Sequence, residues 1–197
     1  MRMKWKLVVL NVVMMSWHLS CDANTHVITE QLSREASQLT SAYSKELQGA
    51  LAAAMKSGGP VAAVQACNHL APSITDQYNR HGDWQIGRTS AKLRNPNNAP
   101  DPWQQKGLEY FEQQVANGAA PQSLVYSEVV EKNGRQHYRF MKAIIMPPLA
   151  KAPCLQCHGA KIAPEVQTKL TQLYPTDQAV GYQAGQVRGA FTLIKAL

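Results

Sequence analysis

The sequence contains a single Cys-x-x-Cys-His run, formed by Cys154, Cys157 and His158. This spacing is typical of covalent attachment of a c-type haem, in which both thiols bond to the porphyrin and the histidine binds the iron. A redox dithiol does not need the following histidine, and a zinc knuckle needs a second closely spaced cysteine pair. The two remaining cysteines, Cys21 and Cys67, do not form such a pair. We therefore expect one covalent haem c, with His158 as an iron ligand and a fold that encloses a porphyrin.

The amino terminus has the pattern of a secretory signal peptide. Arg2, Lys4 and Lys6 precede an apolar stretch at residues 7–15, which is interrupted only by Asn11. This stretch is too short to span a bilayer and has the length of a signal's hydrophobic region. Export agrees with the cysteine motif, because its thiols must meet haem outside the cytoplasm. We expect a periplasmic protein.

Two processing sites are open at the end of this segment. A weak lipobox ends at Cys21, and lipidation there would tether the mature protein to a membrane. Ordinary cleavage after Ala23 is the preferred interpretation, because small residues precede the bond. We therefore expect a signal peptide at residues 1–23 and one haem domain at residues 24–197, a length that supports a single core.

The charge of the chain is positive but diffuse. Lys and Arg number 20 against 13 Asp and Glu, which gives a net charge of +7. The basic residues do not gather into the stripe that nucleic-acid binding needs, so we expect no nucleic acid among the partners. A mild positive charge would instead help docking to an acidic redox partner protein. The sequence leaves the oligomeric state open.

The first half of the chain is predicted to be helical. Residues 25–55 have apolar positions at helical spacing and contain no proline. Gly58 and Gly59 would end this helix, and the proline that follows them is well placed to begin a second helix at residues 60–79. Residues 83–102 are rich in Arg, Asn and Pro, and we expect them to form a long, ordered loop.

The second half changes from helical spacing to alternation. Asn133 and Gly134 separate two alternating stretches and are a strong hairpin signal. The expected elements are a short helix at 102–118, strands at 123–130 and 136–145, a helix at 164–173 and a closing strand at 189–194. Helices followed by antiparallel strands predict an α+β fold.

The candidates for the second iron ligand are Cys67, His26, His69, His81, His137, Met55, Met141 and Met146. The predicted helix at residues 60–79 separates two of them. Its apolar stripe includes Val64 and Cys67, whereas His69 lies about 200° away on the opposite face. A helix packed on the porphyrin would therefore present Cys67 or His69, and the apolar face favours Cys67. Two other interpretations of Cys67 stay open, a buried structural thiol and a disulfide with Cys21.

A longer pattern extends well beyond the cysteine motif. Its first part consists of Cys67, Ala71-Pro72, Gly87-Arg88-Thr89-Ser90, Lys92-Leu93-Arg94-Asn95-Pro96, Asn98, Pro100-Asp101 and Trp103. Its second part consists of Cys154, Cys157, His158-Gly159, Tyr174-Pro175, Asp177, Ala179, Gly181-Tyr182, Gly185 and Gly189-Ala190. With this pattern the chain resembles a family of PAS-like monohaem cytochromes c, found in secreted proteins and in bacterial sensor proteins.

The resemblance implies N-terminal helices followed by a PAS-like antiparallel sheet that carries the haem. It also implies six-coordinate iron, with His158 as the proximal and Cys67 as the distal ligand. A thiolate ligand would favour ferric iron and lower the reduction potential. Arg88, Lys92 and Arg94 are candidates to pair with the haem propionates, and the alternative is that they hold their own loop together or face solvent.

Two functions fit these expectations. The preferred one is a periplasmic carrier of single electrons between partner proteins. The alternative is a haem-based redox or gas sensor that signals through a separate partner protein. The absence of a kinase, cyclase or chemotaxis-type segment favours the carrier, whereas the Cys67 ligand and the PAS-like form favour the sensor. We do not expect an enzyme, because six-coordinate iron leaves no open position for a substrate.

Overall fold

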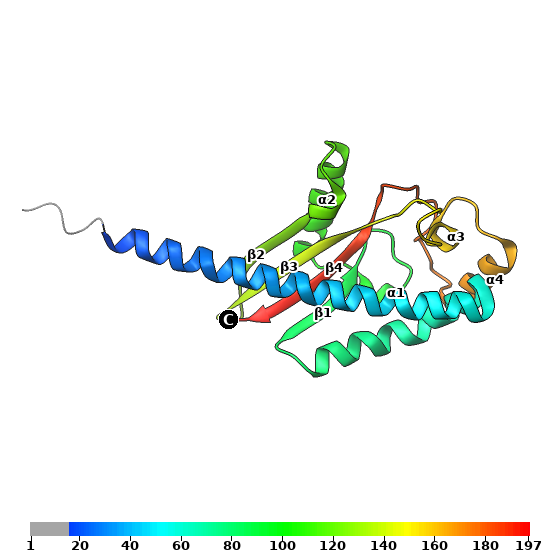
Figure 1. Ribbon diagram of the computed structural model, residues 1–197, viewed down its shortest axis with the longest axis horizontal. Helices are drawn as coiled ribbons and strands as arrows, with labels where there is room; N and C mark the ends of the chain where they lie inside the picture. Colours follow the sequence, from blue (N-terminus) through cyan, green and yellow to red (C-terminus); the bar gives the residue numbers. More distant parts are fainter. Residues whose placement is uncertain (1–15) are drawn as a thin grey trace, which may run out of the picture.

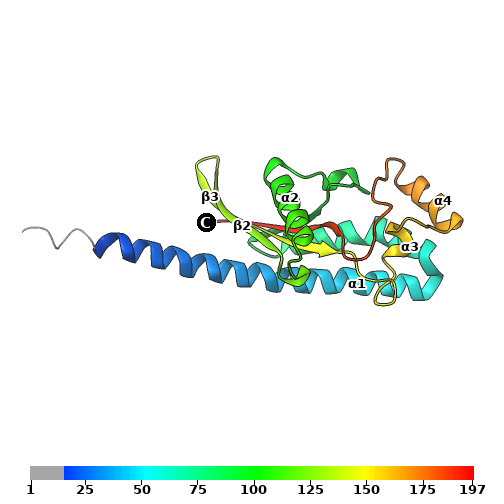
Figure 2. The same cartoon turned by 90° about the horizontal axis from the view of Figure 1, so that it is seen from above.

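Four antiparallel strands in the order β1-β4-β3-β2 form the centre of the computed structural model (Figure 1). The structure describes residues 16–197, and of residues 16–26 and Gln122 the backbone alone. Helix α1 lies against one face of the sheet and α2 against the other (Figure 2). The elements are α1 (Ser16–Arg80), β1 (Trp84–Thr89), η1 (Pro96–Asn98), α2 (Pro102–Ala116), η2 (Pro121–Ser123), β2 (Val125–Lys132), β3 (Arg135–Ile145), α3 (Leu155–His158), α4 (Pro164–Leu173) and β4 (Val187–Ala196). The predicted α+β class is confirmed.

The side chains of β3 point alternately to the two faces of the sheet, and each face carries a hydrophobic core. Tyr138 and Phe140 are buried in a cluster with Tyr43 of α1. Met141, the next residue of β3, is buried on the opposite face with Phe111 of α2. Because successive side chains of a strand point to opposite faces, a single strand holds both helical layers. Each of these large buried side chains contributes roughly 1.5–3 kcal/mol to folding.

Helix α1 turns back on itself at Gly58 and Gly59. Gly59 has φ +66°, a left-handed conformation that glycine adopts without steric cost. The parts before and after this turn run antiparallel (Figure 1). Their contact is marked by Tyr43, whose hydroxyl lies 2.6 Å from that of Thr75 and whose ring packs edge-on against Tyr78. The predicted break between two helices is therefore confirmed.

The expectation of a loop over residues 83–102 is wrong at its start, where β1 forms. Trp84 and Ile86 are 7% and 5% exposed and lie in the core on the α1 side. The partner of β1 is β4, so Trp84 pairs with Lys195 and no local sequence pattern marks the pairing. The Asn79 side chain caps the free edge of β1. It accepts a hydrogen bond from the Ile86 N–H at 2.7 Å and donates one to the Ile86 carbonyl at 3.1 Å.

The predicted hairpin at Asn133 and Gly134 is confirmed. Their φ angles are +54° and +72°, as a two-residue turn between antiparallel strands requires. Helix α2 begins with a capping box, in which Asp101 accepts from the Gln104 N–H and the Gln104 side chain accepts from the Asp101 N–H. Helix α4 has the predicted bounds, and β4 extends beyond its expected range at both ends.

The signal-peptide prediction concerns the first residues of the chain. Its apolar stretch at residues 7–15 lies outside the described residues, as do the side chains of Cys21 and Ala23. Among the described residues, no helix combines the length and the apolar character that crossing a membrane requires.

Candidate functional site

The cysteine motif (Cys154, Cys157 and His158) forms one helical turn at the end of the sheet. The Cys157 and His158 N–H groups both donate to the Cys154 carbonyl, at 3.2 and 3.0 Å. This turn places the two thiols three residues apart, so they lie on the same side of α3. All three side chains are half-buried. The motif thus presents two thiols and an imidazole together.

Hydrogen bonding fixes which nitrogen of His158 is available to a ligand. Its Nδ1 lies 2.7 Å from the carbonyl oxygen of Ala179. A carbonyl only accepts, so Nδ1 carries the proton and the lone pair is on Nε2. The chain that follows Ala179 is also bound to the motif, because Tyr182 donates to the His158 carbonyl at 2.9 Å and Gly181 to the Gly159 carbonyl at 3.0 Å. A hydrogen bond from Nδ1 to a backbone carbonyl, like the one from His158 to Ala179, orients an imidazole for a metal.

The surroundings keep His158 neutral. Burial lowers the pKa of His158 well below its usual value, and the positive charges of Arg94 and Arg188 lower it further. The hydrogen bond to Ala179 opposes this shift. A neutral imidazole is the form that binds a metal.

Arg94 connects the loop before α2 to the cysteine motif. Its Nη2 lies 2.9 Å from the Asp177 carboxylate, in a pair whose side chains are 11% and 7% exposed. The same nitrogen donates to the Cys157 carbonyl at 2.5 Å and to the Ala179 carbonyl at 3.3 Å, and Nη1 lies 3.4 Å from His158 Nε2. Asp177 also accepts from the Ala179 N–H at 2.8 Å. Arg94 therefore holds the segment that orients the imidazole.

Lys92 and Arg188 surround Tyr182, whose ring meets that of His158 edge-on at 6.3 Å. The Lys92 ammonium lies 4.8 Å and the Arg188 guanidinium 5.4 Å from the centre of the Tyr182 ring. Lys92 also donates to the Val180 carbonyl at 3.0 Å. Lys92 and Arg94 thus connect their loop to residues 177–180, and Arg94 also connects it to the cysteine motif.

Cys67 faces the cysteine motif from the second part of α1. Burial raises the pKa of the Cys67 thiol, while the positive charges of Arg88 and Arg94 oppose that shift. A negative charge on Cys67 in turn raises the pKa of Cys154 and of Cys157. The side chain of Cys67 is exposed in the structure.

The wall beside Cys67 is apolar. Val64, one turn earlier on α1, is 3% exposed and packs with Val166 and Leu170 of α4. Cys157 contacts the same cluster. His69 is exposed, on the opposite side of the helix. Not all of the predicted apolar stripe is buried, since Leu70 is 47% exposed.

Sequence reasoning gave no role to Ala179, Asp177 or Arg188. Ala179 acts through its carbonyl, which every residue has, so no side-chain signal could have identified it. Arg188 is largely enclosed, donates to the Ser90 hydroxyl at 2.8 Å, and has its pKa lowered by burial. The signal that could have found it is a charged residue directly before the strand predicted at residues 189–194.

Comparison with known proteins identifies the family of this chain. The model of the Tll0287-like family matches residues 20–195. The chain belongs to that family. The family resemblance inferred from the sequence is thereby confirmed.

A solved structure agrees with membership of the Tll0287-like family. The chain is similar to the crystal structure of the cyanobacterial heme-protein Tll0287, with a TM-score of 0.57 and 18% sequence identity. The match covers 81% of this chain and 93% of that one, and it shows a shared fold. The comparison with curated proteins gave no match.

Proposed function

We propose that the chain is a monohaem c-type cytochrome that transfers single electrons in the periplasm. One observation carries this proposal. Cys154, Cys157 and His158 lie on one helical turn, and the bond from His158 Nδ1 to Ala179 puts the lone pair on Nε2, where iron would replace the long 3.4 Å contact with Arg94. The related protein Tll0287 is itself described as a heme-protein, which supports the same cofactor here.

The residues present fit a haem better than a bare metal ion. Within the described residues, no three His, Cys, Asp or Glu side chains gather as ligands for a metal ion. A porphyrin supplies its own nitrogen donors, so the protein needs to add only axial ligands and an apolar wall. Val64 and Val166 supply such a wall next to Cys157. When bound, the haem provides a centre that is reduced and oxidised by one electron.

Cys67 is the distal ligand in this proposal. A negative charge on its thiol raises the pKa of Cys154 and of Cys157, which supports a position near the cysteine motif. His69 is on the other side of the helix. A sulfur ligand that binds as a thiolate stabilises ferric iron and keeps the reduction potential low.

Arg88 is the basic residue that we assign to a haem propionate. It is half-buried in β1, on the same face as Trp84 and Ile86, and therefore on the side of α1. Its charge lowers the pKa of Cys67, which supports a position near the proposed distal ligand. No acidic side chain among the described residues forms an ion pair with Arg88, in contrast to Arg94. A propionate would supply that partner bidentately.

A pyridine haemochrome spectrum tests this proposal. The full chain, produced in a host that matures c-type cytochromes, should give the spectrum of a haem with two thioether bonds. Replacing Cys154 and Cys157 with Ala should leave haem that acidified solvent extracts. In low-temperature electron spin resonance of the ferric protein, Cys67→Ser should change the low-spin signal and the matched variant His69→Gln should not. A colourless wild-type protein would reject the proposal.

The second candidate is a redox or gas sensor. Its support is the proposed Cys67 ligand, because a thiol that becomes protonated can leave the iron and an external ligand can take its place. Carbon monoxide distinguishes the two functions when it is added to the reduced protein. Rapid binding favours the sensor, whereas inertness together with fast electron exchange favours the carrier.

A further inference from the structure

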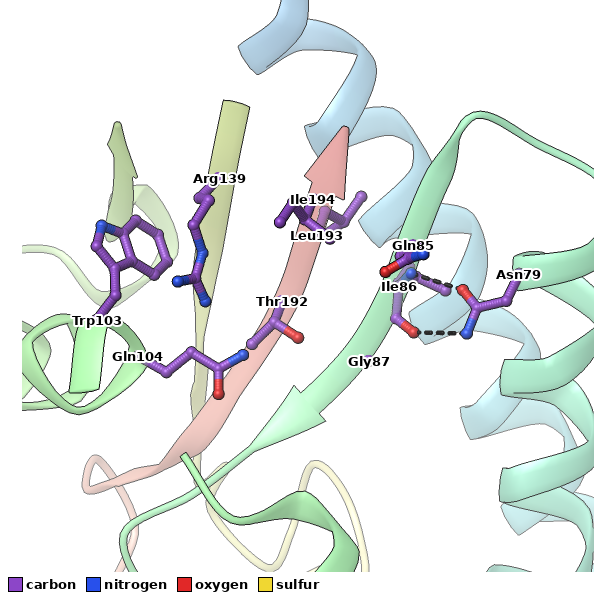
Figure 3. Close-up of a pocket in the computed structure, with 10 residues that line it drawn as sticks. All are labelled: Asn79, Gln85, Ile86, Gly87, Trp103, Gln104, Arg139, Thr192, Leu193 and Ile194. Carbon is purple, nitrogen blue, oxygen red and sulfur yellow. Dashed lines mark hydrogen bonds between the residues drawn. The ribbon is translucent and has the colours of Figure 1, made fainter. Parts of the chain in front are cut away.

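A cavity of about 350 Å³ lies on the α2 face of the sheet and shares no residue with the cysteine motif (Figure 3). Strands β1 and β4 form its floor, and the first turn of α2 forms one side. At about 30 Å³ per water molecule, it would hold about twelve waters. It therefore has room for a small organic molecule.

The side of the cavity next to α2 is built around Arg139. The guanidinium stacks on the Trp103 ring, with its carbon 4.3 Å from the ring centre. Its Nη2 donates to the Asp101 carboxylate. The contacts among the described residues leave Nε and Nη1 to the cavity, where the side chain is drawn in Figure 3. Stacking and ion pairing hold the guanidinium in one orientation, which reduces the entropy lost when a ligand binds.

Further hydrogen-bonding groups converge on the same space. Gln104 uses its side-chain oxygen in the capping box, so its amide NH2 remains to donate. In Figure 3 that nitrogen points toward Thr192, whose hydroxyl lies on the floor of the cavity. The groups that meet a ligand are therefore mostly donors.

The floor is open because Gly87 has no side chain. Gly87 pairs with Thr192 across β1 and β4. A Cβ atom at Gly87 would meet the Thr192 hydroxyl at 3.2 Å. The φ angle of Gly87 lies outside the left-handed range, so the backbone does not require glycine here. The glycine is needed for space.

We propose that this cavity binds a small monocarboxylate that carries a second hydrogen-bonding group next to the carboxylate. Arg139 offers guanidinium N–H groups that Asp101 does not use, and one of them can donate a charge-assisted hydrogen bond to a carboxylate oxygen. Among the described residues that line the cavity, Arg139 is the one cation. Asp101 and Glu128 lie close behind Arg139 and Trp103, so a second negative charge on the ligand would be repelled. Gln104 and Thr192 bind the neighbouring hydroxyl or carbonyl.

Isothermal titration calorimetry of the full chain with lactate tests the proposal. We expect saturable binding with one site, and binding of the neutral lactamide weaker by on the order of tenfold or more, because an amide cannot pair with the guanidinium charge. Succinate and sulfate at the same ionic strength should bind more weakly than lactate. Absence of saturable lactate binding, or tighter binding of either dianion, overturns the proposal.

Four variants locate the binding. Arg139→Lys keeps a positive charge for Asp101 but lacks the planar fork, and it should weaken lactate binding by on the order of tenfold. Gly87→Val should abolish binding by filling the floor, and Thr192→Val should weaken it without changing the volume. Arg135→Gln, which removes an exposed charge in the same strand, is the matched control and should bind like wild type. Equal affinity in wild type, Arg139→Lys and Thr192→Val would place the ligand elsewhere and refute the site.

Discussion

Replacement of Arg94 with Met should destabilise the protein strongly. Arg94 and Asp177 are 11% and 7% exposed, so Met at position 94 leaves a carboxylate enclosed with only the Ala179 N–H as a partner. Removing one member of such a pair costs about 3–5 kcal/mol of the free energy of unfolding. In a chain of this size that corresponds to a fall of about 6–20 °C in Tm. The Cys157 carbonyl also loses its Arg94 donor, and the Ala179 carbonyl keeps only His158.

Thermal and urea unfolding measure this loss, and two comparisons make the result specific. Arg34→Met removes an exposed pair with Glu30, whose side chains are 66% and 55% exposed, and should change the unfolding free energy by less than about 0.5 kcal/mol. The double variant Arg94→Met/Asp177→Asn should be more stable than Arg94→Met alone, because no unpaired charge remains. The reasoning is refuted if Arg94→Met costs no more than Arg34→Met, or if the two changes at positions 94 and 177 are additive.

Three further predictions follow from the same geometry. In the haem-free variant without Cys154 and Cys157, the unfolded chain binds a proton at His158 that the folded chain does not, because burial lowers the folded pKa. Stability should therefore fall as the pH drops below about 6.5, by up to about 1.4 kcal/mol per pH unit, until the folded pKa is reached; urea midpoints measure this, and His158→Gln should remove that slope. Asn79→Ala should cost about 1 kcal/mol by freeing the edge of β1 at Ile86, and an unchanged Tm would contradict it. Arg88→Gln should shift the reduction potential while haem stays covalently bound, whereas Arg135→Gln should not, as voltammetry would show.

The elements that the sequence predicted are those with local signals. The two parts of α1 show helical spacing and are separated by Gly58 and Gly59, and the hairpin is marked by Asn133 and Gly134. Strand β1 was missed because half of it is polar and its partner β4 lies far along the chain. The pairing depends on tertiary contacts that no short window of sequence contains.

The candidate site also contains residues that a local sequence signal predicted and residues that it could not predict. Cys154, Cys157 and His158 are adjacent in sequence and carry their own spacing signal, while Cys67 was found through its helical stripe and the family resemblance. The bond from His158 to Ala179 could not be predicted, because a backbone carbonyl has no residue type. The hydrogen-bond partners of Arg94 could not be predicted either, because its pairing with Asp177 depends on how two distant loops meet.

The central claim is that Cys154 and Cys157 hold one porphyrin covalently. Mass spectrometry of the intact chain in denaturing acid tests it most directly. Protein from a host that matures c-type cytochromes should carry the added mass of one haem, and the variant with Ala at both positions should carry none. A wild-type chain with the mass of its amino acids alone would contradict the account.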